Sequence, residues 1–341
     1  MTARPSSSAT AAARPAADDS PHESPLPGIA LLVTAMAVVP VMDGIAKYLS
    51  ASYPVSQIVW ARYFFHMAIL LPLVLWQYGK RGLLPRRPLA QLLRSSFLLC
   101  STVFFFAAIA LIPLADAIAL VFISPLIVTA CSPFVLGEQV GIRRWSAVLI
   151  GFLGALIVFR PGLGVFQLGS LLAVAAGSTY ACYILATRKL SGSAPPLVTL
   201  LQTAVVGAVV MSLIVPFTWV APAASDLALM AAMGAVAAGG HFLIIKAFER
   251  APASLLAPYG YSEIVTATLI GYLVFGDFPD HWTWLGIAVI VAAGIYISLR
   301  ERRRRRPVVA GMASAAPSPD APPTPDAPGA IAPERRDRGA E

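Results

Sequence analysis

Val135-Leu136-Gly137-Glu138 recurs 139 positions later as Val274-Phe275-Gly276-Asp277. The same shift superposes other marked residues: Pro113 on Pro252, and Trp145 on Trp284. Residues 28–162 and 168–302 therefore form two copies of one unit with five hydrophobic segments. A unit that crosses a membrane five times ends on the side opposite its start, so its copy must insert upside down. Such inverted repeats are typical of secondary transporters, which exchange two pseudo-symmetric conformations around a site near the midplane.

The composition of the 341-residue chain is that of a polytopic helical membrane protein. Hydrophobic residues make up 57% and charged residues 12% of it, and the mean hydropathy is +0.74. A soluble domain carries about twice that share of charge. The three cysteines lie in apolar segments without disulfide or metal spacing, so we expect packing roles for them and neither a metal nor a cofactor. They are Cys100, Cys131 and Cys182.

Ten apolar runs have about the length that a helix needs to cross the hydrocarbon layer, which predicts an all-α protein with ten transmembrane helices. The runs are 28–49, 55–78, 91–112, 114–136, 145–161, 168–189, 196–217, 227–248, 253–275 and 282–300. The polar, Ala/Pro-rich tails at 1–27 and 303–341 are too poor in apolar residues to bury a core, so we expect both to be disordered.

Lysine and arginine in the connections predict the orientation. Sixteen basic residues follow even-numbered runs, including five in 79–94 and six from 300 to 306, whereas only Arg160 lies on the other side. Both termini are therefore expected in the cytoplasm. The Arg302–Arg306 run comes directly after a membrane segment, which favours an anchor on anionic lipid over a nucleic-acid site.

Ionisable residues at membrane depth are costly and usually face the bundle interior or a water-filled cavity. In the first span Asp43 and Lys47 are spaced i,i+4 with the acid first. This spacing suits a self-neutralising pair near the outer end as well as a place in a cavity. We therefore consider Asp43 a candidate for proton coupling.

Arg62, Tyr63 and His66 share one polar stripe in the second span. Arg62 lies about 10 Å deep at 1.5 Å per residue, too deep for its charge to reach the headgroups easily. Its planar guanidinium suits a carboxylate or phosphate, which makes all three residues candidates for substrate binding. The alternative is a buried ion pair of Arg62 with Asp43 or Asp116.

Two further spans add candidates for substrate binding, each with a structural alternative. In the eighth span, His241 is either a site residue or a hydrogen-bonded structural one, and Lys246 either binds substrate or pairs with Glu249. In the sixth span, Tyr180 and Tyr183 offer a stacking surface for a heterocyclic substrate unless they pack in the core.

The ninth span carries the most concentrated polar cluster, around Glu263. Tyr259 lies one turn before it and Ser262 beside it, and Pro258 removes a backbone hydrogen bond nearby. We expect Glu263 near the midplane, where it would meet an amine, carry a coupling proton or pair with a base. In the first copy its equivalent is Ser124.

The two copies differ where chemistry is expected. Arg62 corresponds roughly to Gln202, and Ser124 to Glu263. The chain has no Gly-x-Ser-x-Gly, His-Glu-x-x-His or Gly-x-x-x-x-Gly-Lys motif, so we expect neither an enzyme nor ATP-driven transport.

Taken with these motifs, the two halves resemble paired EamA domains of the drug/metabolite transporter superfamily, over about residues 28–302. The resemblance rests on Ser124-Pro125-Leu126 through Gly137-Glu138, Trp145 and Gly151-Phe152-Leu153-Gly154, and on Ala257-Pro258-Tyr259-Gly260-Tyr261 and Gly271 through Asp277. Arg62 stands where the family often has an arginine, whereas Asp277 replaces a glutamate and Glu263 stands at a position that is more often uncharged. The resemblance implies a ten-helix carrier in the bacterial inner membrane.

These observations predict a secondary transporter of a small amino-acid-like or carboxylate-bearing metabolite, coupled to a proton or an exchange substrate and working as a monomer or homodimer. One alternative is an uptake carrier for a heterocyclic metabolite such as riboflavin or S-adenosylmethionine. Another is a non-transporting scaffold or an intramembrane enzyme that uses Ser262 with His241.

Overall fold

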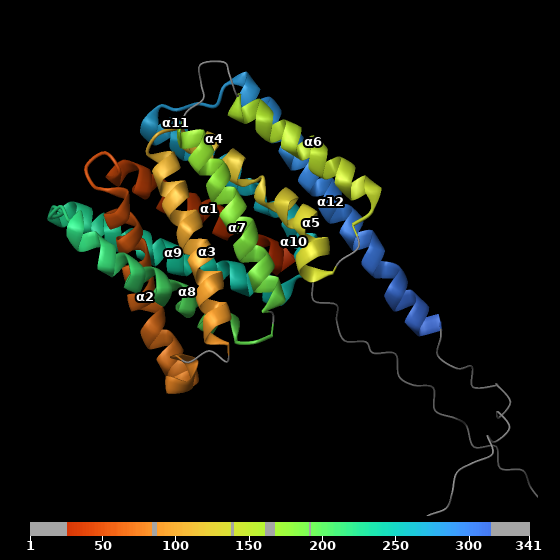
Figure 1. The fold of residues 1–341 in the computed structure, drawn as a ribbon, viewed down its shortest axis with the longest axis horizontal. Helices are drawn as coiled ribbons and strands as arrows, with labels where there is room; N and C mark the ends of the chain where they lie inside the picture. The colour runs from red at the N-terminus through yellow and green to blue at the C-terminus, as the bar shows by residue number, and fades with distance from the viewer. Residues whose placement is uncertain (1–25, 84–86, 138–139, 161–167, 191, 315–341) are drawn as a thin grey trace, which may run out of the picture. The chain divides into compact units, whose positions relative to one another are not determined.

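The computed structural model describes residues 26–83, 87–137, 140–160, 168–190 and 192–314 (Figure 1). The predicted disorder of the tails therefore falls mostly outside the described residues. The described residues up to Leu299 form one compact unit, and the described residues from Arg300 belong to a second. The described residues contain helices and their connections but no strand, which confirms the all-α class.

The first repeat comprises α1 (Leu26–Leu49), α2 (Val55–Tyr78), α3 (Pro88–Ile109), α4 (Leu114–Val121), α5 (Ser124–Leu136) and α6 (Ile142–Phe159). The second comprises α7 (Leu168–Lys189), α8 (Pro196–Ile214), α9 (Ala224–Arg250), α10 (Ala253–Gly260), α11 (Ser262–Phe275) and α12 (His281–Ser314). Short 3₁₀ turns, Gly79–Leu83 and Val215–Phe217, follow α2 and α8. Helix α12 continues beyond residue 300, where the last apolar run was predicted to end.

Nine helical segments within the described residues are long and apolar enough to cross a membrane. The tenth predicted span, 253–275, consists of α10 and α11, which at 8 and 14 residues are too short individually. Its repeat mate is interrupted at the equivalent place, between α4 and α5. Pro125 and Pro258, which lack an amide donor, lie close to the two breaks.

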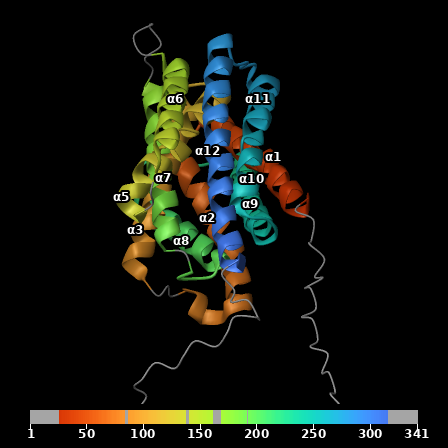
Figure 2. The same cartoon turned by 90° about the vertical axis from the view of Figure 1, so that its right-hand side faces the viewer.

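The repeats are interlocked, because the first five helices of each copy, α1–α5 and α7–α11, pack mainly on helices of the other copy. The largest contacts join α1 to α9 and α3 to α7, which are equivalent pairs under the repeat, and α2 meets its own equivalent, α8. Each interrupted span packs on the first helix of the opposite repeat: α4 and α5 on α7, and α10 and α11 on α1. The last helices of the two copies, α6 and α12, run side by side (Figure 2), where Gly154 and Gly286 allow close approach.

The repeated motif that ends each interrupted span is a helix stop. Gly137 and Gly276 both adopt the left-handed conformation, with φ of 70° and 71°, and cap α5 and α11. Glycine takes this conformation without the steric cost that a Cβ atom brings. The recurrence of residues 135–138 as residues 274–277 therefore reflects the same need for a left-handed glycine at the helix end in both repeats.

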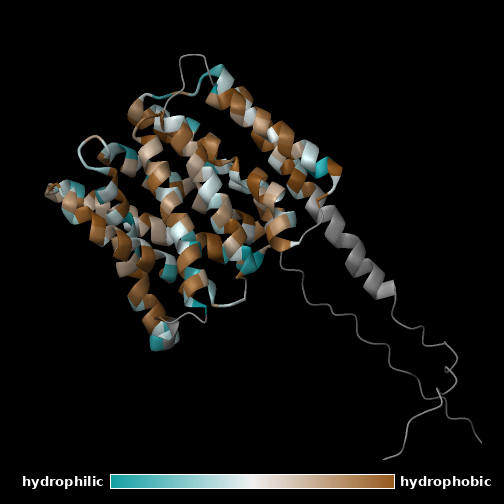
Figure 3. Cartoon of the chain, viewed as in Figure 1, coloured by the Kyte–Doolittle hydropathy of each residue, from teal (hydrophilic) through white to brown (hydrophobic). Residues whose placement is uncertain are grey.

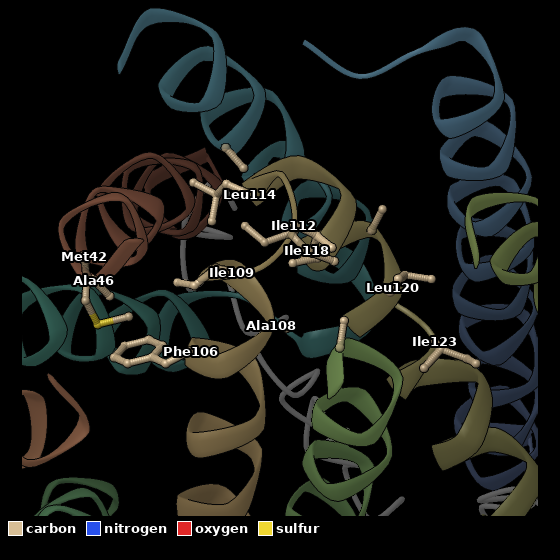
Figure 4. Packing of buried hydrophobic residues seen from close by; sticks show 14 of the residues in the cluster. Met42, Ala46, Phe106, Ala108, Ile109, Ile112, Leu114, Ile118, Leu120 and Ile123 are labelled. Carbon is tan, nitrogen blue, oxygen red and sulfur yellow. The ribbon is translucent and has the colours of Figure 1, made fainter. Parts of the chain in front are cut away.

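The core lies where α1, α3 and the interrupted first-repeat span meet. Figure 4 shows Met42 of α1 beside Phe106 of α3, with Ile118 and Leu120 of α4 nearby. Apolar residues line most of the helices (Figure 3), and large side chains such as Trp76, Phe217 and Leu273 are exposed. An exposed apolar surface of this extent fits lipid rather than water.

Contacts between connections agree with the predicted sidedness. Tyr53 bonds Asp226 at 2.7 Å, and Gln57 bonds the Val220 carbonyl at 2.8 Å, so the links after α1 and α8 lie at one end. One basic residue that was counted with the 79–94 connection does not lie in a loop: Arg94 is inside α3 and only 1% exposed.

Candidate functional site

A cavity of about 350 Å³ lies between the repeats, within the size range of small-molecule sites. It is lined by α1, α2, α3, the α4–α5 span, α7, α9 and the α10–α11 span. Its titratable lining residues are Asp43, Arg62, Tyr180, His241 and Glu263. The structure thus brings together five of the predicted site residues from five different spans.

Arg62 presents a positive charge to this cavity without a carboxylate partner. Its guanidinium donates to Thr102 Oγ1 at 2.5 Å and lies over the rings of Tyr63 and Phe106, 5.2 and 5.7 Å from their centroids. None of the ion pairs formed by the described residues includes Arg62, so the alternative pair with Asp43 or Asp116 is not formed. Its Nε is buried and has no hydrogen-bond partner in the described part of the chain. An anion that entered the cavity would therefore find an unsatisfied donor.

Tyr63 lies behind Arg62 rather than in the cavity. Its hydroxyl is 2.9 Å from Thr102 Oγ1 and 3.3 Å from the Leu98 carbonyl. The ring packs directly on Gly207 of α8, where any Cβ atom would overlap it. Tyr63 thus helps to position Thr102, which accepts the hydrogen bond from Arg62.

Asp43 and Glu263 bring two carboxylates to the same cavity. Asp43 is 3% exposed on α1, and Glu263 lies in the first turn of α11. Asp43 lies close enough to Glu263, and Arg62 close enough to Asp43, for their charges to interact. Neither acid takes part in an ion pair among the described residues. A cationic group in the cavity would therefore meet two carboxylates that form no ion pair with a basic side chain of the described residues.

The lysines predicted beside these acids pair elsewhere. Lys47 lies 3.4 Å from Asp277, so the predicted i,i+4 pair with Asp43 is not formed. Lys246 forms an exposed pair with Glu249 at 2.8 Å and does not line the cavity.

The histidines of α2 and α9 meet, but only one reaches the cavity. His241 lines it, and its Nδ1 lies 3.0 Å from the Ala237 carbonyl. His66 is buried behind it, with the ring centroids 5.7 Å apart. The Nε2 atom of His66 has no partner among the described residues.

Tyr180 lines the cavity, and Tyr183 stacks behind it at 5.7 Å between ring centroids. The Tyr183 hydroxyl accepts a hydrogen bond from Arg94 at 3.3 Å. Arg94 is otherwise held by neutral acceptors, including Gln91 and Thr203, at 2.9 and 2.7 Å. This cluster supports one wall of the cavity from the side of α7 and α8.

Two remaining candidates lie at the α10–α11 junction but do not line the cavity. Tyr259 is 39% exposed, and Ser262 donates to its carbonyl at 2.7 Å. Binding roles for Tyr259 and Ser262 stay predictions.

Sequence reasoning missed the apolar half of the lining and two polar residues, Ser101 and Thr102. Four phenylalanines line the cavity, and Thr102 accepts the hydrogen bond from Arg62. They are Phe105, Phe106, Phe122 and Phe248. A phenylalanine or threonine in an apolar span carries no signature of its own, so no signal distinguished them.

The starts of the second helices of the two repeats allow Arg62 to be compared with its counterpart in α8. Pro54 and Pro195 precede α2 and α8, and both Arg62 and Thr203 stand eight residues after them. By this count the position equivalent to Arg62 is Thr203, next to Gln202. Gln202 instead donates to the Leu83 carbonyl at 2.6 Å.

Comparison with known proteins gives two matches to the EamA-like transporter family, over residues 26–160 and 167–300. The chain belongs to this family. The matches cover most of the chain and coincide with the two interlocked repeats, which confirms the resemblance drawn from sequence.

Similar EamA-like proteins include carriers of different metabolites. An S-adenosylmethionine uptake transporter of Rickettsia prowazekii is 27% identical over 82% of this chain and 94% of its own. A riboflavin transporter of Vibrio cholerae is 31% identical over 83% and 96%. The pseudopaline exporter CntI of Pseudomonas aeruginosa is 31% identical over 80% and 95%.

A solved crystal structure shares the fold of this EamA-like chain, with a TM-score of 0.59 at 20% identity, covering 81% of this chain and 98% of that one. The family and the apolar helices together make this a multi-pass membrane protein of a transporter family.

Proposed function

We propose that this protein is a secondary carrier for a small organic metabolite that bears both a carboxylate and a cationic group. The observation that carries the proposal is the joint presence of unpaired Arg62, Asp43 and Glu263 in one cavity between the repeats. Arg62 would hold the carboxylate, and the two acids would hold the cation. Rocking of the interlocked repeats would expose this site to either side of the bacterial inner membrane, with both termini in the cytoplasm.

The aromatic lining favours a substrate with a flat or apolar body. Phe105, Phe122 and Tyr180 would pack on it, while the charged groups fix its orientation. S-adenosylmethionine joins an amino-acid head to a cation and a purine, and so matches every part of the lining. Riboflavin has no carboxylate or fixed cation and would leave Arg62, Asp43 and Glu263 without partners. We therefore favour an amino-acid-like cation over a neutral heterocycle.

The two cavity acids also support coupling of transport to a proton or to an exchanged substrate. A carboxylate that holds a cationic substrate in one step is free to take a proton in the next, so substrate and proton compete for the same group. Asp43 and Glu263 are the coupling candidates because both line the cavity and neither forms an ion pair within the described part of the chain.

The rival functions fit the geometry less well. An enzyme would use Ser262 with His241, but Ser262 bonds the Tyr259 carbonyl and His241 lies against the Ala237 carbonyl. A scaffold needs no charged cavity between its repeats. The arrangement favours a carrier over both.

Counterflow in proteoliposomes tests the proposal. The panel comprises S-adenosylmethionine, riboflavin, pseudopaline and single amino acids, each measured with and without a pH gradient. We expect saturable flux for members that carry both charges. Arg62→Gln should raise KM at least tenfold, since a hydrogen-bonded charged group contributes about 1.5–3 kcal/mol. The matched control is Arg143→Gln, which removes an exposed arginine and should leave KM unchanged.

The same experiment has two outcomes that count against the proposal. The first is the absence of saturable flux across the whole panel. The second is riboflavin flux that is equal in the wild type and in Arg62→Gln, which would favour the neutral heterocycle.

A further inference from the structure

Lys47, near the end of α1, ties the two repeats together beyond the cavity. Its ammonium donates to the carbonyls of Ile109 and Ile112 at 3.1 and 2.7 Å and lies 3.4 Å from Asp277. It also lies 5.4 Å from the centroid of the Phe275 ring. One side chain thus joins α1, the α3–α4 link and the α11–α12 link.

The contacts of Lys47 are partly shielded from solvent. The side chain of Lys47 is 14% exposed and that of Asp277 is 33% exposed. Charge-assisted bonds in such a place are stronger than those of a fully exposed pair. Opening this end of the bundle would break the ion pair and both carbonyl bonds at once.

From the neighbourhood of Lys47, the cavity extends toward only one end of the helix bundle. Its lining on α1 runs from Leu32 to Asp43 and stops one turn before Lys47. On α9 it reaches Phe248, two residues before the helix ends, and on α10 it includes Leu256, near the helix start. The cavity therefore approaches the end of the bundle where α1 begins and is shut at the end where Lys47 lies.

Asp43 and Lys47 also place the site and this contact on the same helix. They are four residues apart, so they lie one above the other on one face of α1. Between them Gly44 packs against Ile270 of α11 closely enough that a Cβ atom would lie 2.8 Å from its side chain. A shift of α1 at Asp43 would move Lys47 with it.

We propose that Lys47 and Asp277 form a latch that keeps the far end of the bundle closed, and that a ligand at Asp43 acts on this latch through α1. The proposal rests on the carrier function proposed above. It assigns the described conformation to the state that is open at the end where α1 begins. Release of the latch is the step that lets the repeats rock.

Thiol labelling of the purified protein in detergent tests the latch without any substrate. In a background with the three cysteines replaced by alanine, Ile118→Cys reports on the latch side of the cavity and Ile184→Cys on the opposite mouth. With a hydrophilic maleimide, we expect Lys47→Met and Asp277→Asn to speed labelling at position 118 about tenfold. Labelling at position 184 should slow. Lys189→Met, which removes an exposed lysine at the end of α7, is the matched control and should change neither rate.

Unchanged labelling at position 118 in folded Lys47→Met and Asp277→Asn proteins would overturn the latch. Asp277→Asn keeps the shape of the side chain, so the test stands if Lys47→Met fails to fold. A labelling shift without flux in the counterflow panel would keep the latch and reject the proposed carrier. Flux without a labelling shift would do the reverse.

Discussion

Phe122 and Tyr261 occupy equivalent positions in the two repeats, 139 residues apart, and their rings touch, with centroids 4.9 Å apart and planes inclined at 37°. Each stands at the break of its interrupted span, between α4 and α5 or between α10 and α11. A pseudo-twofold axis that relates the repeats must pass close to this pair. The halves of the protein therefore meet in direct contact at the point where each loses its helical continuity.

Phe122 and Tyr261 should be energetically coupled. A double-mutant cycle with Phe122→Leu and Tyr261→Leu should give a coupling energy of about 0.5–1.5 kcal/mol, as for other aromatic pairs. Thermal unfolding in detergent measures it. Simple additivity of the two substitutions would show that the rings merely fill space. The peripheral pair Tyr272 and Phe278, with centroids 5.7 Å apart, provides a matched cycle at the membrane edge.

Gly294 should be intolerant of alanine because of Tyr261. A Cβ atom at position 294 of α12 would overlap the Tyr261 hydroxyl and come within 2.8 Å of Cζ. Overpacking of this kind costs about 1–3 kcal/mol, so Gly294→Ala should lower Tm clearly. Adding Tyr261→Phe removes the overlapping oxygen and should restore most of the loss. A Tm as low in the double variant as in Gly294→Ala would mean that the clash lies elsewhere.

Gly207→Ala should act on Arg62 from a distance. The added methyl group would push the Tyr63 ring, and with it Thr102, the acceptor of Arg62. We expect a loss of about 1–3 kcal/mol in stability and a rise in KM for the carboxylate-bearing substrate. Thermal unfolding and counterflow measure the two effects.

Gly239→Ala is the control for this substitution. It stands in α9 with nothing within 4 Å of the added methyl group, so it should be neutral or slightly stabilising. If Gly207→Ala lowers stability but leaves KM unchanged, Tyr63 has no part in positioning Arg62.

Asp280 should stabilise the protein in a pH-dependent way. A hydrogen bond from Arg160 lowers the pKa of Asp280 from 3.8 to about 2. Because the folded pKa lies below the unfolded one, the stabilisation is complete above about pH 4 and disappears as the pH falls towards 2. The carboxylate is 44% exposed, so solvent screening limits the effect to about 1 kcal/mol.

Asp280→Asn isolates the charge, because asparagine still accepts the Thr283 amide bond that caps α12. Its Tm should fall by about 2–4 °C at pH 7, and the difference should shrink at pH 3. Glu249→Gln, which breaks an exposed pair on the other side, should show no such trend. If Asp280→Asn lowers Tm equally at both pH values, the loss of stability does not come from the ion pair with Arg160.

The repeat, the helical class and the family were predictable because they depend on hydrophobic pattern and on helix stops. Gly137 and Gly276 illustrate this, because a helix cap in the left-handed conformation favours glycine, which can be recognised in the sequence. The breaks at Phe122 and Tyr261 were less visible. Apolar residues continue across them, and Pro125 and Pro258 are compatible with a kinked helix as well as with two short ones.

The candidate site was predictable only in part, because contacts between distant residues decide it. Lys47 has an acid one turn away at Asp43, yet it forms its ion pair with Asp277, 230 residues later. The stripe of α2 placed Arg62 and Tyr63 together, but apolar neighbours surround both. Nothing in the sequence showed that Arg62 faces the cavity while Tyr63 faces Gly207.

The cavity brings one guanidinium and two carboxylates into the path between the repeats. With both acids ionised, the empty site carries one net negative charge, and it must travel with the repeats when they rock. Moving one elementary charge across a potential of 100 mV costs or yields about 2.3 kcal/mol. A bound substrate with one net positive charge, or a single proton, cancels that charge, so a carrier loaded in this way and the empty carrier would respond differently to the membrane potential. The return step of the empty protein, rather than the loaded one, would then be the voltage-dependent part of its cycle.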